Sequence, residues 1–117
     1  MELQKSHFVT DWLDKRARHS PQRVGLVDTV GGREITYREW NAAANRTANF
    51  LRALGVQKGD RVAVYASNCV EYLDTLFACG KIGAIQHNLN WRLAVPELTA
   101  MIEDAAPIVL ILSLIHI

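Results

Sequence analysis

The stretch Lys58 to Leu93, KGDRVAVYASNCVEYLDTLFACGKIGAIQHNLNWRL, decides the fold because a strand, a helix and a second strand follow one another in it without a gap. Its first apolar run, Arg61 to Ala66, shows no alternation of apolar and polar residues, which is typical of a strand covered on both faces in a parallel sheet. Asn68 is the expected N-cap of the helix, with Glu71 three residues later. We expect the second strand at Ala84 to His87.

The helix in this stretch is apolar around most of its circumference, so we expect it to be sandwiched deep in the parent fold; the residues concerned are Val70, Tyr72, Leu73, Leu76, Phe77 and Cys79. Downstream, Pro96 is placed to be the first residue of another helix, and Pro107 ends it. That helix should turn Leu98, Met101, Ile102 and Ala105 inward. Ile108 to Leu112 then reads as a third strand, which completes a βαβαβ pattern with right-handed crossovers and a mostly parallel sheet.

Upstream of the decisive stretch, the spacing of apolar residues from Ser6 to His19 predicts an amphipathic surface helix that Ser20 and Pro21 end. The segments Gly25 to Val30 and Arg33 to Tyr37 predict a β-hairpin. Gly31 and Gly32 lie between them, where a two-residue turn needs positive backbone dihedrals.

Thr36 and Glu39 have the spacing of a capping box, which predicts the start of a long helix and contributes about 1 kcal/mol. Gly55 is placed to close that helix in a left-handed conformation. Its buried stripe is expected to consist of Trp40, Ala44, Thr47, Leu51 and Leu54.

Across about Phe8 to Ile111 the order of these elements resembles the N-terminal part of the AMP-binding, adenylate-forming enzymes. The resemblance rests on short pieces in the expected order: Arg23 to Leu26, Ile35 to Tyr37, Gly55-Val56, Lys58 to Val62 and Gly80 to Ala84. Asn90 to Leu93 looks more like the acyl-CoA ligases of that family than like peptide-synthetase adenylation domains. The resemblance implies an α/β fold, with residues 1–112 as an incomplete N-terminal part of the synthetase domain.

Members of that family activate a carboxylic acid with Mg-ATP to an acyl-adenylate and pass the acyl group to coenzyme A. The resemblance therefore implies an acid-thiol ligase, with a fatty acid as the expected substrate and ATP, Mg²⁺ and coenzyme A as cofactors of the parent protein. The family's phosphate loop, magnesium ligand, ribose ligand and mobile-domain lysine have no counterparts here. We assign no catalytic, cofactor-binding or metal residue, and we expect this piece to be inactive alone and to need no cofactor.

Several residues are candidates for a functional site. Lys81 follows Gly80 without the spacing of a phosphate-binding loop, and it is expected to be a helix-end charge. His87 is expected to be a satisfied or exposed structural residue, with a substrate-pocket role as the alternative. Asn88, Asn90, Trp91 and Arg92 gather at the carboxyl end of a strand, where open α/β sheets bind ligands. Loop packing by Trp91 and a surface ion pair by Arg92 are the competing roles.

Composition excludes several other classes. The 117 residues carry 13 basic and 12 acidic side chains without a basic, aromatic stripe, so nucleic acid is not an expected partner. The four histidines and two cysteines lack the spacings of zinc sites, and Cys69 and Cys79 should be reduced thiols. No secretory or transit signal is visible, which favours the cytoplasm. The apolar run Ile108 to Ile117 is too short to span a membrane as a helix.

The last five residues, Ser113 to Ile117, do not continue the family pattern and resemble a translated sequencing adapter, so we expect a non-native tail. Two other interpretations stay open. One keeps the ligase chemistry but changes the substrate to an aryl, amino or short-chain acid. The other is a small, non-catalytic α/β binding or interaction domain, which the bare apolar strand at Ile108 to Leu112 disfavours because an uncovered sheet edge invites aggregation.

Overall fold

Strand β3 (Arg61–Tyr65) is the central strand of a three-stranded parallel sheet in the computed structural model, which describes residues 11–112. Strand β4 (Ile85–Leu89) pairs with it on one side and β5 (Val109–Leu112) on the other. Val62, Ala63 and Val64 are each at most 1% exposed, so β3 is covered on both faces. The predicted βαβαβ unit with a parallel sheet is confirmed.

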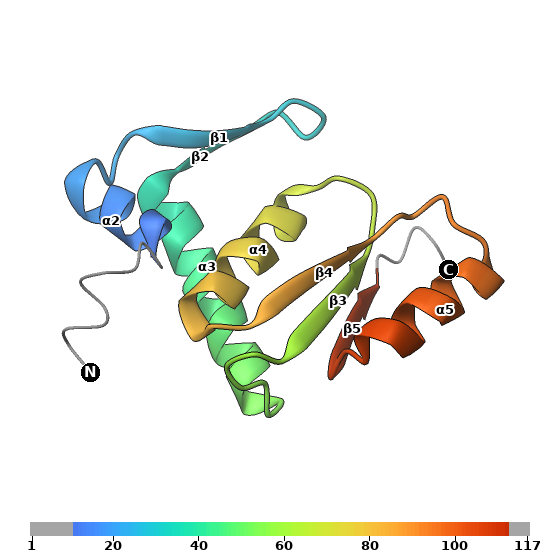
Figure 1. Ribbon diagram of the computed structural model, residues 1–117. Coiled ribbons are helices and arrows are strands. Elements are labelled where there is room, and N and C mark those ends of the chain that lie inside the picture. The colour runs from blue at the N-terminus through green and yellow to red at the C-terminus, as the bar shows by residue number, and fades with distance from the viewer. Residues whose placement is uncertain (1–10, 113–117) are drawn as a thin grey trace.

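Helices cover the two faces of this sheet (Figure 1). Helices α3 (Tyr37–Ala53) and α4 (Val70–Ile82) lie on one side, and α5 (Val95–Ala105) lies on the other. Val62 faces the first side, where it joins one apolar cluster with Ala48, Leu51, Val56, Ala78 and Cys79. The α/β class is therefore confirmed, while the hand of the crossovers stays a prediction.

The start of α4 differs from the sequence prediction. The N-cap is Cys69, whose backbone is extended with φ −157° and ψ 169°, and no side chain caps the helix. Asn68 lies one residue too early because the chain turns into the helix only at Val70. Deep burial of α4 is expected in the longer parent fold, and it stays a prediction. Thr75, Ala78 and Cys79 are buried, whereas Leu76 is 43% exposed.

The hairpin consists of β1 (Val24–Asp28) and β2 (Arg33–Thr36), which pair antiparallel. Its turn has four residues and not two, because Asp28 pairs directly with Arg33. The Asp28 carboxylate accepts hydrogen bonds from the backbone N–H groups of Val30 and Gly31 and so closes the turn. Only Gly32 of the two glycines has a positive φ, +69°.

Helix α3 begins and ends as predicted. The Thr36 hydroxyl accepts from the Glu39 N–H at 3.2 Å, and the Glu39 carboxylate accepts from the Thr36 N–H at 2.9 Å, which completes the capping box. Gly55 follows the helix with φ +97°. The buried stripe includes Ala48, which the prediction omitted, whereas Leu54 is half exposed.

Helix α2 (Trp12–His19) begins at Trp12 because Asp11 has a non-helical backbone and its side chain accepts from the Asp14 N–H. The predicted stop after His19 is confirmed, while the predicted start at Ser6 lies outside the described residues. In Figure 1, α2 and the hairpin lie together at the opposite end of the molecule from α5.

Helix α5 begins at Val95, so Pro96 is its second residue and not its first. The four residues predicted to face inward are its only half-buried ones, namely Leu98, Met101, Ile102 and Ala105. On β5, Val109 and Ile111 pack against the apolar cluster, whereas Leu110 and Leu112 are 43% and 49% exposed. None of the helices within residues 11–112 has the length and apolarity needed to cross a bilayer. The proposed tail at Ser113 to Ile117 lies outside the described residues.

Candidate functional site

The carboxyl ends of β3 and β4 meet at one edge of the sheet because the two strands run parallel, with Tyr65 opposite Leu89. The chain continues from them into the loops at residues 66–69 and 90–94. The Tyr65 hydroxyl donates a hydrogen bond to the backbone carbonyl of Trp91 at 3.0 Å. The end of one strand therefore holds the loop that follows its neighbour, at the edge where α/β sheets bind ligands.

Within this loop, the Asn90 side chain accepts a hydrogen bond from the Arg92 N–H at 3.0 Å, and the Asn90 carbonyl accepts from the Leu93 N–H. The Arg92 guanidinium lies over the Trp91 ring, 4.9 Å from its centroid. Within residues 11–112 Arg92 has no carboxylate partner, so the predicted surface ion pair is wrong for that part of the chain. The loop presents an aromatic face and a cation together.

The other two candidates of this region lie inside β4. Asn88 does not join the loop, because its side chain accepts a hydrogen bond from Gln86 Nε2 at 2.8 Å. His87 points to the other face of the strand and is half-buried, and its Nδ1 is enclosed without a hydrogen-bond partner among the described residues. The expectation of a satisfied or exposed histidine is therefore wrong at this nitrogen.

A hollow of about 370 Å³ lies beside the start of α4, lined by Asn68, Cys69, Tyr72 and Leu73. Burial, together with the neighbouring Cys69, raises the pKa of the Tyr72 hydroxyl. Burial raises the pKa of the Cys79 thiol to about 11, so this thiol is not a thiolate nucleophile at neutral pH. Neither group is prepared for covalent catalysis.

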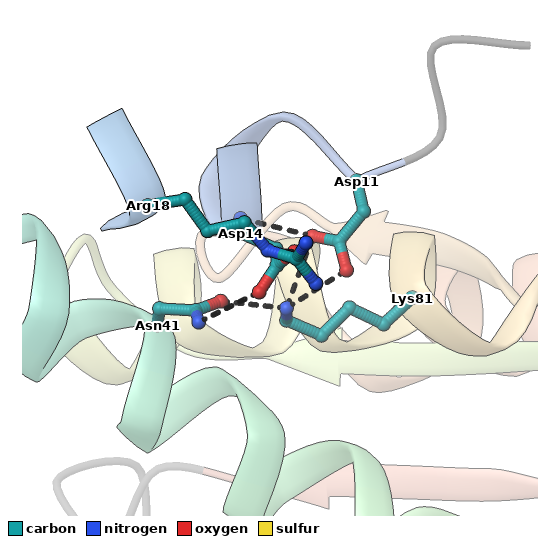
Figure 2. A network of polar contacts seen from close by, with 5 residues as sticks. All are labelled: Asp11, Asp14, Arg18, Asn41 and Lys81. Carbon is teal, nitrogen blue, oxygen red and sulfur yellow. Dashed lines mark hydrogen bonds and ion pairs between the residues drawn. The ribbon is translucent and has the colours of Figure 1, made fainter. Parts of the chain in front are cut away.

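Lys81 in the last turn of α4 is the most connected polar residue in Figure 2. Its ammonium lies 3.0 Å from both carboxylate oxygens of Asp11 and donates to Asn41 Oδ1 at 2.6 Å. The Lys81 side chain is only 8% exposed. It is a helix-end residue as predicted, but it is enclosed in a polar network and its ammonium already has three acceptors.

The network extends to the outer side of α2. Asn41 donates through Nδ2 to Asp14 Oδ1 at 3.3 Å, and Arg18 pairs with Asp14 at 2.8 Å. Sequence reasoning missed Asp11 and Asn41 because they lie 70 and 40 residues from Lys81. Of these two residues, only Asp11 could have been identified from nearby sequence, because it is the N-cap of α2.

A second charged hollow, of about 480 Å³, lies where the hairpin meets α3 and α4, and Arg33, Trp40, Arg46, Glu71 and Asp74 are among its lining residues. Burial raises the pKa of Asp74 to about 6, and the nearby Glu71 adds to this, while Arg46 and Arg33 act in the opposite direction. One Asp74 oxygen and the Trp40 N–H are enclosed without partners among the described residues. This hollow is therefore a polar junction between the hairpin and the two helices.

Neither charged region has the composition of a catalytic centre. Within the described residues no three histidine, cysteine, aspartate or glutamate side chains come together as a metal site would require. The sequence of residues 11–112 has no glycine-rich loop that could hold a triphosphate.

The protein-family description that matches this chain is "AMP-binding enzyme", over residues 13–116. A feruloyl-CoA synthase of Amycolatopsis is 47% identical over 100 residues, which cover 86% of this chain and 20% of that protein. A long-chain-fatty-acid–CoA ligase of Mycobacterium tuberculosis is 39% identical over 99 residues, which cover 85% of this chain and 20% of that protein.

A solved structure of a Mycobacterium tuberculosis fatty acyl CoA synthetase superposes with a TM-score of 0.84 at 38% identity, over 88% of this chain and 21% of that chain. This chain thus spans about a fifth of the length of the relatives it matches. The family match over residues 13–116 includes the parallel sheet and helices α3, α4 and α5.

Proposed function

Because this chain belongs to the AMP-binding enzyme family, we propose that the protein containing it is an AMP-forming acyl-CoA synthetase. The carboxylate of an acid attacks the α-phosphorus of ATP, which releases pyrophosphate and forms an acyl-adenylate. The thiol of coenzyme A then displaces AMP and forms a thioester. The observation that carries this proposal is the family match over residues 13–116, together with relatives that are named as CoA ligases.

The role we assign to residues 11–112 is that of a scaffold. Their sequence has no glycine-rich phosphate loop, so we route no step of the reaction through them. What they supply is a rigid sheet whose carboxyl edge presents the loop Asn90 to Ala94, held by the Tyr65 hydroxyl. We infer that the 117-residue chain does not activate an acid by itself, and that Mg²⁺, ATP and coenzyme A bind the longer protein.

The acid itself is a separate part of the proposal. A fatty acid is the first candidate, supported by the ligase relative at 39% identity and the synthetase structure at 38%. An aryl acid is the second, because the feruloyl-CoA synthase is 47% identical over a similar length. We propose a cytoplasmic enzyme, and one without a nucleic-acid partner because the sequence carries no basic, aromatic stripe.

The test is acid-dependent exchange of labelled pyrophosphate into ATP by the longer protein recovered from the source DNA. The acids are palmitate, ferulate, indoleacetate, propionate and an amino acid, each with and without coenzyme A. We expect exchange with one acid class, thioester formation when coenzyme A is added, and no exchange by the 117-residue chain. Exchange with no carboxylic acid, or release of ADP in place of AMP, would refute the assignment.

A further inference from the structure

Helix α2 is held on the rest of the molecule by an apolar contact and by a charged one. Leu13, 2% exposed, forms a cluster with Trp40 and Ala44 of α3, and Phe77 of α4 packs against it. On the same helix, Asp11 and Asp14 reach the polar network around Lys81 (Figure 2). The helix thus lies as a strap over the junction of α3 and α4.

The two partners of the ion pair are not equally exposed. The Lys81 side chain is 8% exposed, while that of Asp11 is 38% exposed. An ion left unpaired in an enclosed place keeps its desolvation cost, whereas an ion near the surface recovers water. Loss of Asp11 should therefore disturb this region more than loss of Lys81.

One carboxylate also has two tasks. Asp11 Oδ1 accepts from the Asp14 N–H at 3.1 Å, which caps α2, and it accepts from the Lys81 ammonium at 3.0 Å. The formation of the first turn of α2 and its attachment to α4 therefore depend on the same group. Asparagine in place of Asp11 keeps the capping oxygen and removes only the charge.

We propose that the Asp11–Lys81 pair is a latch that decides whether α2 is docked. When Asp11 loses its charge and the enclosed Lys81 ammonium is left unpaired, α2 leaves the α3–α4 junction as one unit, and the Trp40 side chain beneath it becomes exposed. The sheet and the α3–α4 pair stay folded, so α2 undocks without global unfolding.

The experiment compares Asp11→Asn, Lys81→Met and the double variant by hydrogen exchange at the backbone amides of Lys15 and Ser20. Both amides donate to carbonyls of this segment, Asp11 and Arg16. We expect Asp11→Asn to raise their exchange rates by about tenfold or more, and Lys81→Met by about threefold. The double variant should match Lys81→Met, because it no longer has an enclosed unpaired charge. The amide of Val62 in β3 should not change.

A packing role for Lys81 gives the opposite pattern. It predicts that Lys81→Met is the more damaging substitution and that the two effects multiply in the double variant; either result, or no change in any variant, overturns the latch. Arg18→Gln is the matched control, because Arg18 belongs to the same network but its side chain is 79% exposed. It should change the rates by less than about twofold.

A second measurement follows Trp40 by fluorescence in a Trp12→Phe, Trp91→Phe background. Asp11→Asn should shift its emission to the red and make it accessible to a neutral quencher, and the double variant should reverse most of this. If Asp11→Asn unfolds the whole chain, recovery of the fold in the double variant supports the latch, and failure to recover overturns it. Should the isolated chain lack protection at Val62, the same variants are measured in the longer protein.

Discussion

The hydroxyl of Tyr65 donates a hydrogen bond to the carbonyl of Trp91, so the end of β3 fixes the loop that follows β4. The two residues are 26 positions apart, and the parallel pairing of β3 with β4 brings them together. This contact joins the sheet to the loop that carries the cation of Arg92 over the Trp91 ring.

Removing that hydroxyl should loosen the loop without changing the sheet. Tyr65→Phe keeps the ring and loses one hydrogen bond, so we expect a loss of about 1 kcal/mol in the free energy of unfolding. Exchange of the Leu93 amide, which donates to the Asn90 carbonyl, should become faster. Tyr72→Phe is the control, and in this variant the amides of the loop should exchange as in the unsubstituted chain. Unchanged Leu93 exchange in Tyr65→Phe would mean that the bond does not hold the loop.

The burial of β3 on both faces predicts a steric limit at Ala63. This residue is 0% exposed and lies beside Leu110 of β5, on the face that α5 covers. Ala63→Leu should cost about 1 to 3 kcal/mol of unfolding free energy, because the space is already filled. Leu110→Ala, at a side chain that is 43% exposed, should cost clearly less. Chemical denaturation measures both, and equal costs would contradict the layered arrangement.

Two glycines near the end of α4 should respond to alanine with opposite signs. Gly83 has φ +76°, and an added Cβ would lie 2.9 Å from the Lys58 side chain, so Gly83→Ala should destabilise by about 1 kcal/mol or more. Gly80 lies inside the helix and is exposed, so Gly80→Ala should stabilise by about 0.5 to 1 kcal/mol. Thermal unfolding of the two variants gives the comparison. If both variants shifted the unfolding temperature in the same direction, the left-handed end of α4 at Gly83 would be contradicted.

Asp74 should make stability depend on pH. Its pKa in the folded chain is about 6, raised from 3.8 first by burial and then by Glu71, so the folded state holds the proton more tightly than the unfolded state. Stability should therefore fall as the pH rises from about 4 to about 6 and then level off. Asp74→Asn should remove this slope and add about 1 to 2 kcal/mol at pH 7, a figure reduced for partial exposure.

Denaturation at a series of pH values between 4 and 7 measures that slope. Asp104→Asn, which changes an exposed carboxylate of α5, is the control and should leave the slope in place. A slope that persists in Asp74→Asn would assign the titration to another group.

The parts of the fold that sequence predicted well have local causes. Thr36 and Glu39 are three residues apart, so their reciprocal bonds follow from spacing alone. The inward face of α5 follows from helical periodicity, and the doubly covered β3 follows from its unbroken apolar run. Two of the local predictions were wrong. The N-cap of α4 is Cys69 and not Asn68, which lies one residue earlier. The hairpin turn is longer than predicted, and the Asp28 carboxylate closes it in place of the glycine pair.

The candidate site was less predictable, because its contacts join distant parts of the chain. The loop at Asn90 was found from its position after a strand, but the hydrogen bond from Tyr65 depends on strand pairing. The enclosure of Lys81 depends on Asp11 and Asn41, which belong to two other helices, and no spacing within α4 indicates it. The environment of His87 likewise depends on how α5 covers the sheet.

Acyl-adenylate chemistry in the protein that contains this scaffold is tested most directly by isotope transfer. The longer protein is incubated with ATP, coenzyme A and an acid labelled with ¹⁸O in its carboxylate, and the phosphorus products are examined by mass spectrometry. Attack of the carboxylate on the α-phosphorus predicts that one labelled oxygen appears in AMP. Label in inorganic phosphate with formation of ADP would contradict acyl-adenylate chemistry.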